Sequence, residues 1–407
     1  MRQLIKIAYR DLVRSRRRSL LTLVAIAGGV SLLVFMSGFV QGAITDSIEN
    51  NIRLQTGHVK IRAESYDEDK VSLAWEDLLN DPEELAAQVR ALDGVEAASP
   101  VLWASGIVST REESVGVRVF GIDPLSDVHA RIRDGLAAGE YLQPDDRNGV
   151  LLSERLAKSL GVAVGEQISL LVNTSDGVPD EATFTIRGLY ASGVPVYDDT
   201  TIFLPLSKAQ AFAHTEGRAS MILALLKDRE LADGLAAALR APGYTVLTWR
   251  EMNQVVMQAI QAGMGILYIM YLVVLLVVAV VIANTLLMSV FERIREMGIL
   301  SALGMKGREI LLMFLMEAGI LGSVGVGLGV GLGSLGVFYL SKVGLHLGDM
   351  ATVTTVSAAY GETMYARFAP AETIGVAIAA MVIILLASLY PARFAARLEP
   401  ADALRND

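Results

Sequence analysis

Side chains that carry out chemistry are few in this sequence, and they are not grouped in a catalytic pattern. The 407 residues include no cysteine, so a thiol nucleophile, a thiolate metal site and a disulfide are all excluded. The histidines are scattered along the chain, at His58, His129, His214 and His346. Zinc sites usually show ligands that are closely paired in sequence. The sequence therefore predicts no metal site and no catalytic residue.

A nucleotide-binding loop is also missing. The phosphate-binding motif G-x-x-x-x-G-K-[ST] does not occur, and the partly similar stretch Gly304–Gly307, GMKG, has the wrong spacing. We interpret the acidic run Asp67–Asp69 as a solvated loop rather than a calcium site. We predict no cofactor in this chain, and a stand-alone enzyme is the weakest interpretation of it.

Charged residues do gather in one short segment, 292–309, between two long apolar runs. They are Glu292, Arg293, Arg295, Glu296, Lys306, Arg308 and Glu309. This pattern indicates a cytoplasmic link between two membrane helices, with polar groups able to meet a partner protein. Met297, Ile299, Leu300 and Leu303 add an apolar face, and Gly298 and Gly304 permit tight turns or close contact. The alternative is that these charges only anchor the helix ends among lipid headgroups.

The elements around this link follow from composition. The chain is 53% hydrophobic and 19% charged, with a mean hydropathy of +0.45. Four apolar stretches are long enough to cross a bilayer as helices: 19–43, 264–291, 310–341 and 372–392. The segment 44–263 has an ordinary soluble composition, and its mixed strand and helix patterns indicate an α+β domain of two subdomains. We therefore predict a membrane protein with four transmembrane helices and a large α+β extracytoplasmic domain inserted between the first two.

Residues 1–18 and the apolar run that follows them can each be interpreted in two ways. Residues 1–18 alternate apolar and basic residues, which favours an amphipathic helix in the cytoplasmic membrane surface over a solvated tail. The following apolar run could belong to a cleaved signal peptide. It is longer than the usual apolar region of about 7–15 residues and has no clear cleavage site, so a retained helix is favoured.

Orientation follows from the basic residues near the helix ends. Seven Lys and Arg residues precede Leu20, and four lie in the link, whereas the loop 342–371 has only Lys342 and Arg367. The positive-inside rule then places both termini, the link and the tail 393–407 in the cytoplasm, and the domain 44–263 and the loop 342–371 outside. The acidic balance of the outer domain also argues against nucleic acid as a partner, because it would repel phosphates.

Two features inside the apolar stretches suggest specific contacts. Gly325, Gly329 and Gly333 are spaced four apart on one face of the third helix, which predicts a close helix–helix contact. The alternative is a glycine-rich helix that simply faces lipid. Glu317 lies about two turns into the same helix, where an ionisable group is either functional or extends to the nearby interface.

Within the outer domain, local patterns predict individual elements. Val95–Val108 and Ser114–Ile122 are expected as strands, and Leu151–Leu160 as an amphipathic helix that ends at Gly161. Asn173–Gly177, NTSDG, has the composition of a hairpin loop between two alternating strands.

Two segments resemble the signatures of a known family. NTLLMSVFERIREMGILSALGMKGREI at 284–310 and YPARFAARLEPADAL at 390–404 are similar to segments around the second and fourth membrane helices of FtsX/MacB-type permeases, the type VII or mechanotransmission class of ABC transporters. The helix count and the insert after the first helix match as well. Within the class, GVLLSERLAKSLGVAVGEQISLL at 149–171 is very similar to the lipoprotein-releasing LolC/LolE group.

The resemblance implies partners and a mechanism. Two copies of a separate ATPase would bind ATP and Mg²⁺ and dock on the link, and a second copy of this chain or a homologous permease would complete the transporter. The implied docking residues are Glu292, Arg293, Arg295, Glu296, Met297, Gly298, Leu300 and Gly304. ATP-driven movement of the link would reach the outer domain through the first two helices, and the chain would be a multi-pass protein of the inner membrane.

The implied substrate is a lipoprotein extracted sideways from the membrane. Candidates to line its entry are Leu32, Phe35, Met36, Phe39, Met264, Leu267 and Tyr271, although ordinary packing residues would show the same pattern. The loop 173–183 is short where LolC-type subunits have a long hairpin that recruits a periplasmic carrier, which puts carrier recruitment in doubt. The alternatives are a MacB-like efflux permease for amphiphiles or peptides, working with an adaptor, and an FtsX-like regulator of a cell-wall hydrolase.

Overall fold

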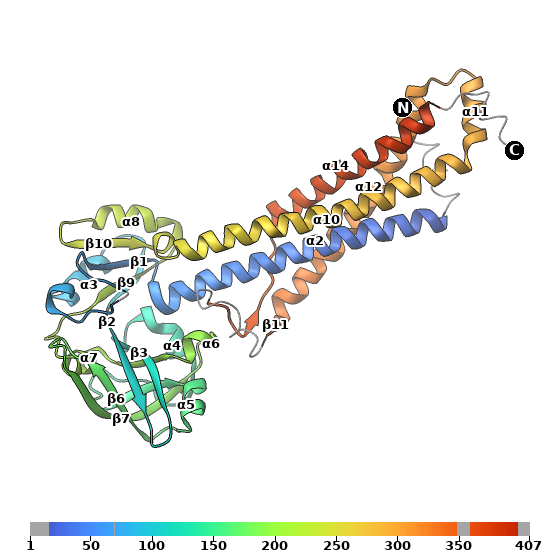
Figure 1. Cartoon of the computed structure of the whole chain (residues 1–407). Coiled ribbons are helices and arrows are strands. Elements are labelled where there is room, and N and C mark those ends of the chain that lie inside the picture. The colour runs from blue at the N-terminus through green and yellow to red at the C-terminus, as the bar shows by residue number, and fades with distance from the viewer. Residues whose placement is uncertain (1–15, 69, 348–358, 398–407) are drawn as a thin grey trace. The chain divides into compact units, whose positions relative to one another are not determined.

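The computed structural model describes residues 16–68, 70–347 and 359–397, which divide into two compact units (Figure 1). The helical unit comprises the chain up to Ile44, Ile260–Leu345 and the chain from Tyr365 onward. The sheet unit comprises Thr45–Ala259 and His346–Met364. Most of the predicted interfacial helix at 1–18, the centre of the loop 342–371 and most of the tail 393–407 lie outside the described residues.

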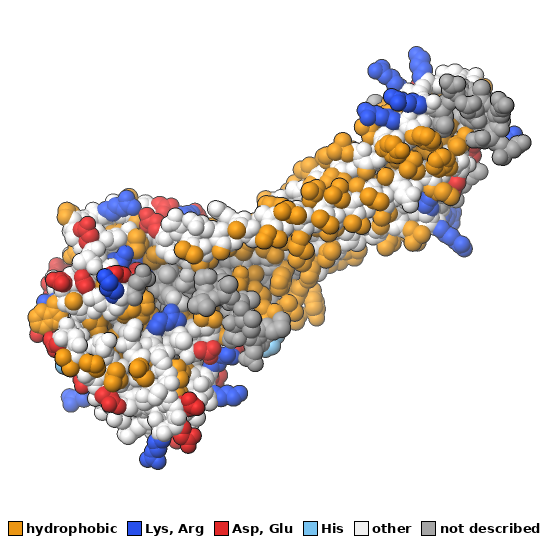
Figure 2. Space-filling view, viewed as in Figure 1, with side chains coloured by type: hydrophobic (Ala, Val, Ile, Leu, Met, Phe, Trp, Pro, Cys, Tyr) orange, Lys and Arg blue, Asp and Glu red, His pale blue; other side chains and the backbone are white. Residues whose placement is uncertain are grey.

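Four long helices could each cross a membrane by length and composition. They are α2 (Arg16–Asn51), α10 (Gln254–Glu292), α12 (Gly307–Val343) and α14 (Pro370–Ala396). Each of the four predicted apolar stretches lies within one of them, and a shorter helix, α11 (Ile294–Ala302), lies between α10 and α12. On the face seen in Figure 2, hydrophobic side chains cover these helices, whereas acidic and basic side chains are spread over the sheet unit.

The core of the helical unit forms where α2 packs against α12. Gly325, Gly329 and Gly333 face α2, and there is no space for a larger residue at these positions. A Cβ atom at Gly325 would lie 2.7 Å from Ile26 Cγ2, and one at Gly329 would lie 2.7 Å from Val30 Cβ. Ile26 and Val30 are fully buried there, together with apolar side chains of α10 and α14. The glycines therefore let two helix backbones approach closely, which is how small residues stabilise membrane helix pairs.

Polar contacts join α2 to α10 near the link. The Thr22 hydroxyl donates a hydrogen bond to Thr285 Oγ1 at 3.1 Å. Arg18 donates to Ser289 Oγ at 3.0 Å and forms an ion pair with Glu292 at 2.7 Å. Hydroxyl side chains that are paired in this way satisfy each other's hydrogen-bonding groups where water is scarce.

The sheet unit is built on ten hydrogen-bonded strands in the order β10-β1-β9-β2-β3-β8-β5-β7-β4, with β6 paired to β2 and β7. The strands are β1 (Val59–Ala63), β2 (Val95–Ser109), β3 (Ser114–Ile122), β4 (Leu136–Gly139), β5 (Gly149–Ser153), β6 (Gln167–Asn173), β7 (Pro179–Tyr190), β8 (Thr201–Pro205), β9 (Met221–Leu226) and β10 (Tyr244–Thr248). Its helices are α3 (Pro82–Arg90), α4 (Ala130–Asp134), α5 (Glu154–Leu160), α6 (Pro195–Asp198), α7 (Leu206–Phe212), α8 (Ala232–Leu239) and α9 (Trp249–Met252). The π-helical turn Ile52–Thr56, the 3₁₀ turns Trp75–Asp77, Asp127–His129 and Arg229–Leu231, and the short strands β11 (Leu345–His346) and β12 (Thr363–Met364) complete the described elements.

The long strand β2 joins two lobes of this unit. Its first part pairs with β9 on the side where β1, β10, α3 and α8 lie, and its second part pairs with β6 (Figure 1). Along that second part β2 also pairs with β3, from Val101 to Ser109. The sheet is therefore continuous through both lobes because one strand of 15 residues serves both.

One predicted element is wrong in its first part. Leu151–Leu160 was expected to be a single amphipathic helix, but β5 occupies Gly149–Ser153 and α5 begins only at Glu154. All five residues of β5 are buried between β7 and β8. Pairing with these strands therefore holds Leu151 and Leu152 in an extended conformation. The Ser153 side chain then caps α5 by accepting a hydrogen bond from the Leu156 N–H, and Gly161, at φ 67°, ends the helix as predicted.

The packing of α12 on α2 gives a first testable prediction. Gly329→Ala should destabilise the purified protein by about 1–3 kcal/mol, because its Cβ would lie 2.8 Å from the Ala27 carbonyl oxygen. The matched control is Gly327→Ala in the same helix, where no atom lies within 4 Å of the added Cβ. Thermal unfolding in detergent should show a lower midpoint for the first variant only. Equal midpoints for both variants would contradict the close contact.

Candidate functional site

The link between α10 and α12 is a defined helical element rather than a simple loop. Helix α11 begins after Arg293 and is followed by Leu303 and Gly304. Gly304 has φ 98°, a conformation that favours glycine and turns the chain sharply toward α12. The Glu309 carboxylate then accepts a hydrogen bond from the Lys306 N–H at 2.9 Å, which caps the first turn of α12.

One face of α11 packs against the helical bundle. Met297 is 2% exposed, and its neighbour Gly298 is also buried. Met297 belongs to a buried apolar cluster drawn from the ends of α10, α12 and α14. The other members of this cluster are Val290, Ile310, Met313, Phe314, Ala392 and Ala395. This packing joins α11 to all three long helices.

The opposite face of α11 is exposed and partly apolar. Leu303 is 80% exposed and Ile299 is 48% exposed, while Arg295 lies one turn earlier on the same face. Glu292, Glu296 and Gly304 are also exposed, and Leu300 is half-buried. We call Arg295, Ile299 and Leu303 the outer face of α11.

This division revises the set of residues expected to dock a partner. Arg293, Met297 and Gly298 were expected to contribute, but the described residues of the chain bury all three. Ile299 and Leu303 were counted as apolar residues of the link but not among the docking residues. The spacing of Arg295, Ile299 and Leu303, four residues apart, is the signal that could have identified one helix face. The docking role itself stays a prediction.

Glu317 is buried inside the chain and faces a basic partner. It is 2% exposed, and its Oε2 lies 3.9 Å from Nη1 of Arg293, which is 9% exposed. Arg293 immediately precedes α11, so this ion pair ties the start of the link to α12. Two charges taken out of water must compensate each other, since either one alone would be costly. Glu317 therefore does not extend to lipid headgroups in this structure.

The residues expected to line a substrate entry fall into two groups. Leu32 is 51% exposed on α2, and Phe35, Phe39 and Met264 are half-buried. Met36 and Leu267 pack against the buried core of the helical unit, and Tyr271 is part of that core. Met36 and Leu267 are nevertheless half-buried like Phe35, Phe39 and Met264, so of these residues only Tyr271 is buried within a single chain.

Each of the four histidines is either buried or in contact with a polar group of its own chain. Buried His58 accepts a hydrogen bond from the Leu226 N–H at 3.0 Å through Nδ1. Burial lowers the pKa of His129 to about 4, so this side chain is neutral in the folded protein. His214 lies at the surface, 3.1 Å from Asp176, and His346 lies 3.2 Å from the Thr363 hydroxyl. Within residues 16–68, 70–347 and 359–397, no three metal-ligating side chains come together.

Comparison with known families identifies the class of protein that combines these two units. Residues 19–241 match the family described as MacB-like periplasmic core domain, and residues 268–400 match the FtsX-like permease C-terminal domain. The chain therefore belongs to the MacB-like periplasmic core domain family and is an ABC transporter permease of the FtsX/MacB type. The predicted fold class, four membrane helices that flank a large α+β domain, is confirmed.

Individual relatives cover nearly the whole chain. The lipoprotein-releasing system transmembrane protein LolC of Neisseria meningitidis is 24% identical over 97% of this chain and 97% of its own length. The macrolide export ATP-binding/permease protein MacB of Rhodospirillum rubrum is 27% identical over 98% of this chain and 60% of its own length. The solved periplasmic region of MacB from Actinobacillus actinomycetemcomitans is 16% identical, covers 51% of this chain and 97% of its own, and has a TM-score of 0.35.

These relatives and the four apolar helices indicate a protein of the inner membrane. The relatives are permease components of ABC transporters, which implies an ATPase partner for this chain.

The buried ion pair gives the second prediction. Arg293→Gln and Glu317→Gln should each destabilise the protein by about 3 kcal/mol, because each leaves an uncompensated buried charge. The loss in the free energy of unfolding for the double variant should be smaller than the sum of the two single losses. The difference should be on the order of 1–2 kcal/mol. Thermal unfolding of the two single variants and the double variant measures this coupling.

Arg308→Gln is the matched control, because Arg308 is exposed in the first turn of α12. It should change stability by less than about 0.5 kcal/mol. Strictly additive effects of Arg293→Gln and Glu317→Gln would show that the two side chains do not interact.

Proposed function

We propose that this chain is the permease subunit of a lipoprotein-releasing ABC transporter. It would couple ATP hydrolysis by a separate ATPase to motion of its extracytoplasmic sheet unit and so extract lipoproteins from the membrane. The observation that carries the proposal is the match to the Neisseria LolC protein, which spans 97% of both chains. The match between 149–171 and the LolC/LolE group points in the same direction.

In this proposal two copies of the ATPase dock on the link and bind ATP and Mg²⁺ themselves. The outer face of α11 would enter the ATPase surface, with the exposed side chains of Leu303 and Ile299 as apolar anchors. Arg295 and Glu296 would contribute charge complementarity at the rim, which favours specificity over raw affinity. The positive-inside rule supports a cytoplasmic location for this link and for both termini.

The contacts inside the helical unit support transmission of a push on α11. Met297 packs among the ends of α10, α12 and α14, and the Arg293–Glu317 pair joins the link to α12. Arg18 then joins Glu292, the last residue of α10, to α2. The helices α2 and α10 would move as rigid elements, because close-packed interiors transmit displacement.

The substrate would enter sideways, between α2 and α10 of two facing subunits. The second subunit would be another copy of this chain or a homologous permease. Leu32, Phe35, Met36, Phe39, Met264 and Leu267, which are exposed or half-buried, are retained as candidates to contact acyl chains. Tyr271 would instead support that surface from within the core.

Recruitment of a periplasmic carrier or adaptor is a separate question. The hairpin loop between β6 and β7, Thr174–Val178, is short and bound to its own domain. Ser175 donates from its backbone N–H to the Ala213 carbonyl at 2.9 Å and from its hydroxyl to the His214 carbonyl at 2.6 Å. A carrier recognised by this subunit would therefore meet a small, fixed turn rather than a long arm.

Efflux of an amphiphile or peptide is the second candidate function. It is favoured by the match to the Rhodospirillum macrolide exporter, which covers 98% of this chain at 27% identity. An adaptor protein would then be a partner. Regulation of a cell-wall hydrolase, as in FtsX-like proteins, is the third candidate.

Affinity purification of the tagged protein in mild detergent tests the proposal. We expect mass spectrometry to find an ABC ATPase together with acylated lipoproteins, since a lipid-anchored substrate held between helices would survive mild extraction. An ATPase found with an adaptor and no lipoprotein would instead support efflux. A hydrolase partner without any acylated substrate would support the regulatory function.

Docking on the outer face of α11 is tested by Leu303→Asp. This change should reduce the amount of co-purified ATPase about ten-fold or more, because a carboxylate would have to be buried at an apolar contact. The matched control is Leu125→Asp in the sheet unit, since Leu125 is 70% exposed and Leu303 is 80% exposed. Retention of the ATPase by the Leu303 variant at the control level would remove α11 from the docking surface.

A further inference from the structure

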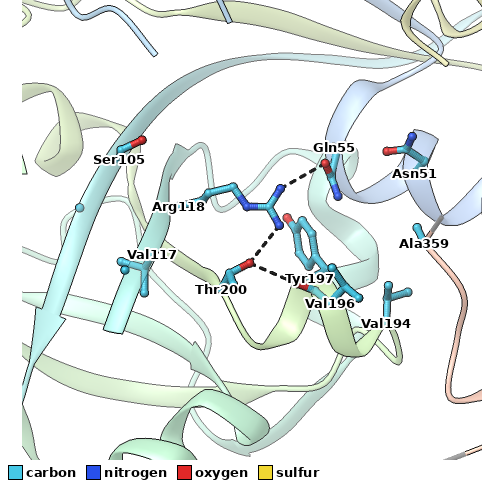
Figure 3. Close-up of a pocket in the computed structure, with 12 residues that line it drawn as sticks. Asn51, Gln55, Ser105, Val117, Arg118, Val194, Val196, Tyr197, Thr200 and Ala359 are labelled. Atoms are coloured by element: carbon cyan, nitrogen blue, oxygen red, sulfur yellow. Dashed lines mark hydrogen bonds between the residues drawn. The ribbon is translucent and has the colours of Figure 1, made fainter. Parts of the chain in front are cut away.

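A cavity of about 610 Å³ lies within the sheet unit, beside strand β3. The end of α2 and the π-helical turn after it contribute Asn51 and Gln55 to one side of the cavity. The segment around α6 contributes Val194, Val196, Tyr197 and Thr200 to another. Figure 3 shows Arg118 of β3 between these two sides, with its guanidinium group directed toward Gln55 and Thr200. The cavity thus combines an apolar wall with one cation.

Arg118 is held firmly but without a counter-ion. It donates to Gln55 Oε1 at 3.3 Å and to Thr200 Oγ1 at 3.0 Å, and its guanidinium carbon lies 5.6 Å from the centre of the Tyr197 ring. No carboxylate of the described residues lies within ion-pair distance of it. A guanidinium has five N–H donors, and the two neutral acceptors leave donors available for an anion.

Strand β3 presents an open backbone edge to the same cavity. It pairs with β2 from Ser114 to Ile122, whereas β8 pairs with it only from Arg118 onward. The Arg118 N–H donates to the Thr200 carbonyl at 2.7 Å, on the β8 side of the strand. Backbone groups alternate along a strand, so the N–H and C=O of Gly116 point to that side too, beyond the start of β8.

Gly116 is exposed and lines the cavity, and no atom lies within 4 Å of a Cβ built on it, so the face of the sheet is also uncovered at this residue. An unpaired stretch of strand edge is a ready template for an extended peptide, which gains affinity from main-chain hydrogen bonds.

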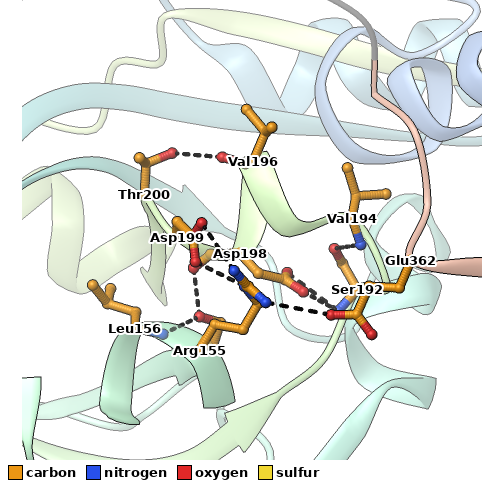
Figure 4. A network of polar contacts seen from close by, with 10 residues as sticks. Arg155, Leu156, Ser192, Val194, Val196, Asp198, Asp199, Thr200 and Glu362 are labelled. Atoms are coloured by element: carbon orange, nitrogen blue, oxygen red, sulfur yellow. Dashed lines mark hydrogen bonds and ion pairs between the residues drawn. The ribbon is translucent and has the colours of Figure 1, made fainter. Parts of the chain in front are cut away.

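Polar contacts hold the α6 segment on the other side of the cavity, as Figure 4 shows. The Asp198 carboxylate accepts from the Ser192 N–H at 3.2 Å, and Arg155 pairs with Asp199 at 2.8 Å and with Glu362 at 3.6 Å. Tyr197 donates its hydroxyl to the Leu54 carbonyl at 2.9 Å. A site that is ordered before binding loses less entropy when a ligand enters.

We propose that this cavity binds an extended peptide segment that carries a carboxylate. The peptide backbone pairs with the open edge of β3 at Gly116, the carboxylate accepts hydrogen bonds from Arg118, and apolar side chains lie against Val196. The strand edge favours a peptide over a lipid headgroup, because only a peptide backbone uses its donor and acceptor. The site does not depend on the transported substrate or on the ATPase.

Fluorescence anisotropy with the full-length protein in detergent tests the site. The probe is a labelled hexapeptide of alternating valine and threonine with one central aspartate, and its partner has asparagine in that position. We expect the aspartate peptide to bind about ten-fold more tightly, since a hydrogen bond to a charged group contributes more than a neutral one. Arg118→Gln should abolish this preference, whereas Arg111→Gln, at an exposed arginine in the β2–β3 turn, should leave it unchanged.

A second variant separates edge pairing from charge. Gly116→Pro should weaken both peptides about ten-fold, because it removes the N–H that the open edge offers, while the other side of β3 keeps its pairing with β2. Unchanged thermal unfolding of this variant confirms that the fold is intact. The proposal is overturned if both peptides bind equally to the wild-type protein, or if Gly116→Pro binds like wild type. It is also overturned if phosphatidylglycerol micelles bind the site and the peptides do not.

Discussion

The helical unit depends on the close contact between α2 and the glycine face of α12. In a bilayer, lipid tails are as apolar as leucine, so helices associate through close packing and polar contacts rather than through the hydrophobic effect. Gly325, Gly329 and Gly333 allow this packing, because Ile26, Val30 and Val34 fill the space that larger residues would occupy. The contacts of α2 with Thr285, Ser289 and Glu292 of α10 then require α2 to keep this position.

The buried charges of the helical unit form one ion pair at the start of the link. Arg293 and Glu317 would each be costly alone in a low-dielectric environment, and together they connect the link to α12. The same short segment turns one face of α11 inward through Met297 and leaves Ile299 and Leu303 outside. In the proposed function, this element would receive force from the ATPase on its open face and pass it to the bundle through its packed face.

The sheet unit follows a different constraint, which is the length of neighbouring strands. Because β2 has 15 residues, it can pair with β9 in one lobe and with β3 and β6 in the other. Because β8 is short, the edge of β3 at Gly116 has no strand partner among the described residues. The open edge beside the cavity results from this mismatch in length.

The sequence by itself determined those features that depend on the type and spacing of nearby residues. Apolar length set the four membrane helices, charge marked the link, and the spacing of Gly325, Gly329 and Gly333 indicated a helix-packing face. The strand Ser114–Ile122 and the end of α5 at Gly161 were also predicted correctly, since alternation and a left-handed glycine are local signals. Only the tertiary structure decided that Leu151 and Leu152 form a buried strand, that Met297 faces inward while Leu303 faces out, and that Glu317 meets Arg293. Each of these outcomes depends on residues that are distant in sequence, and burial by such neighbours overrides local preference.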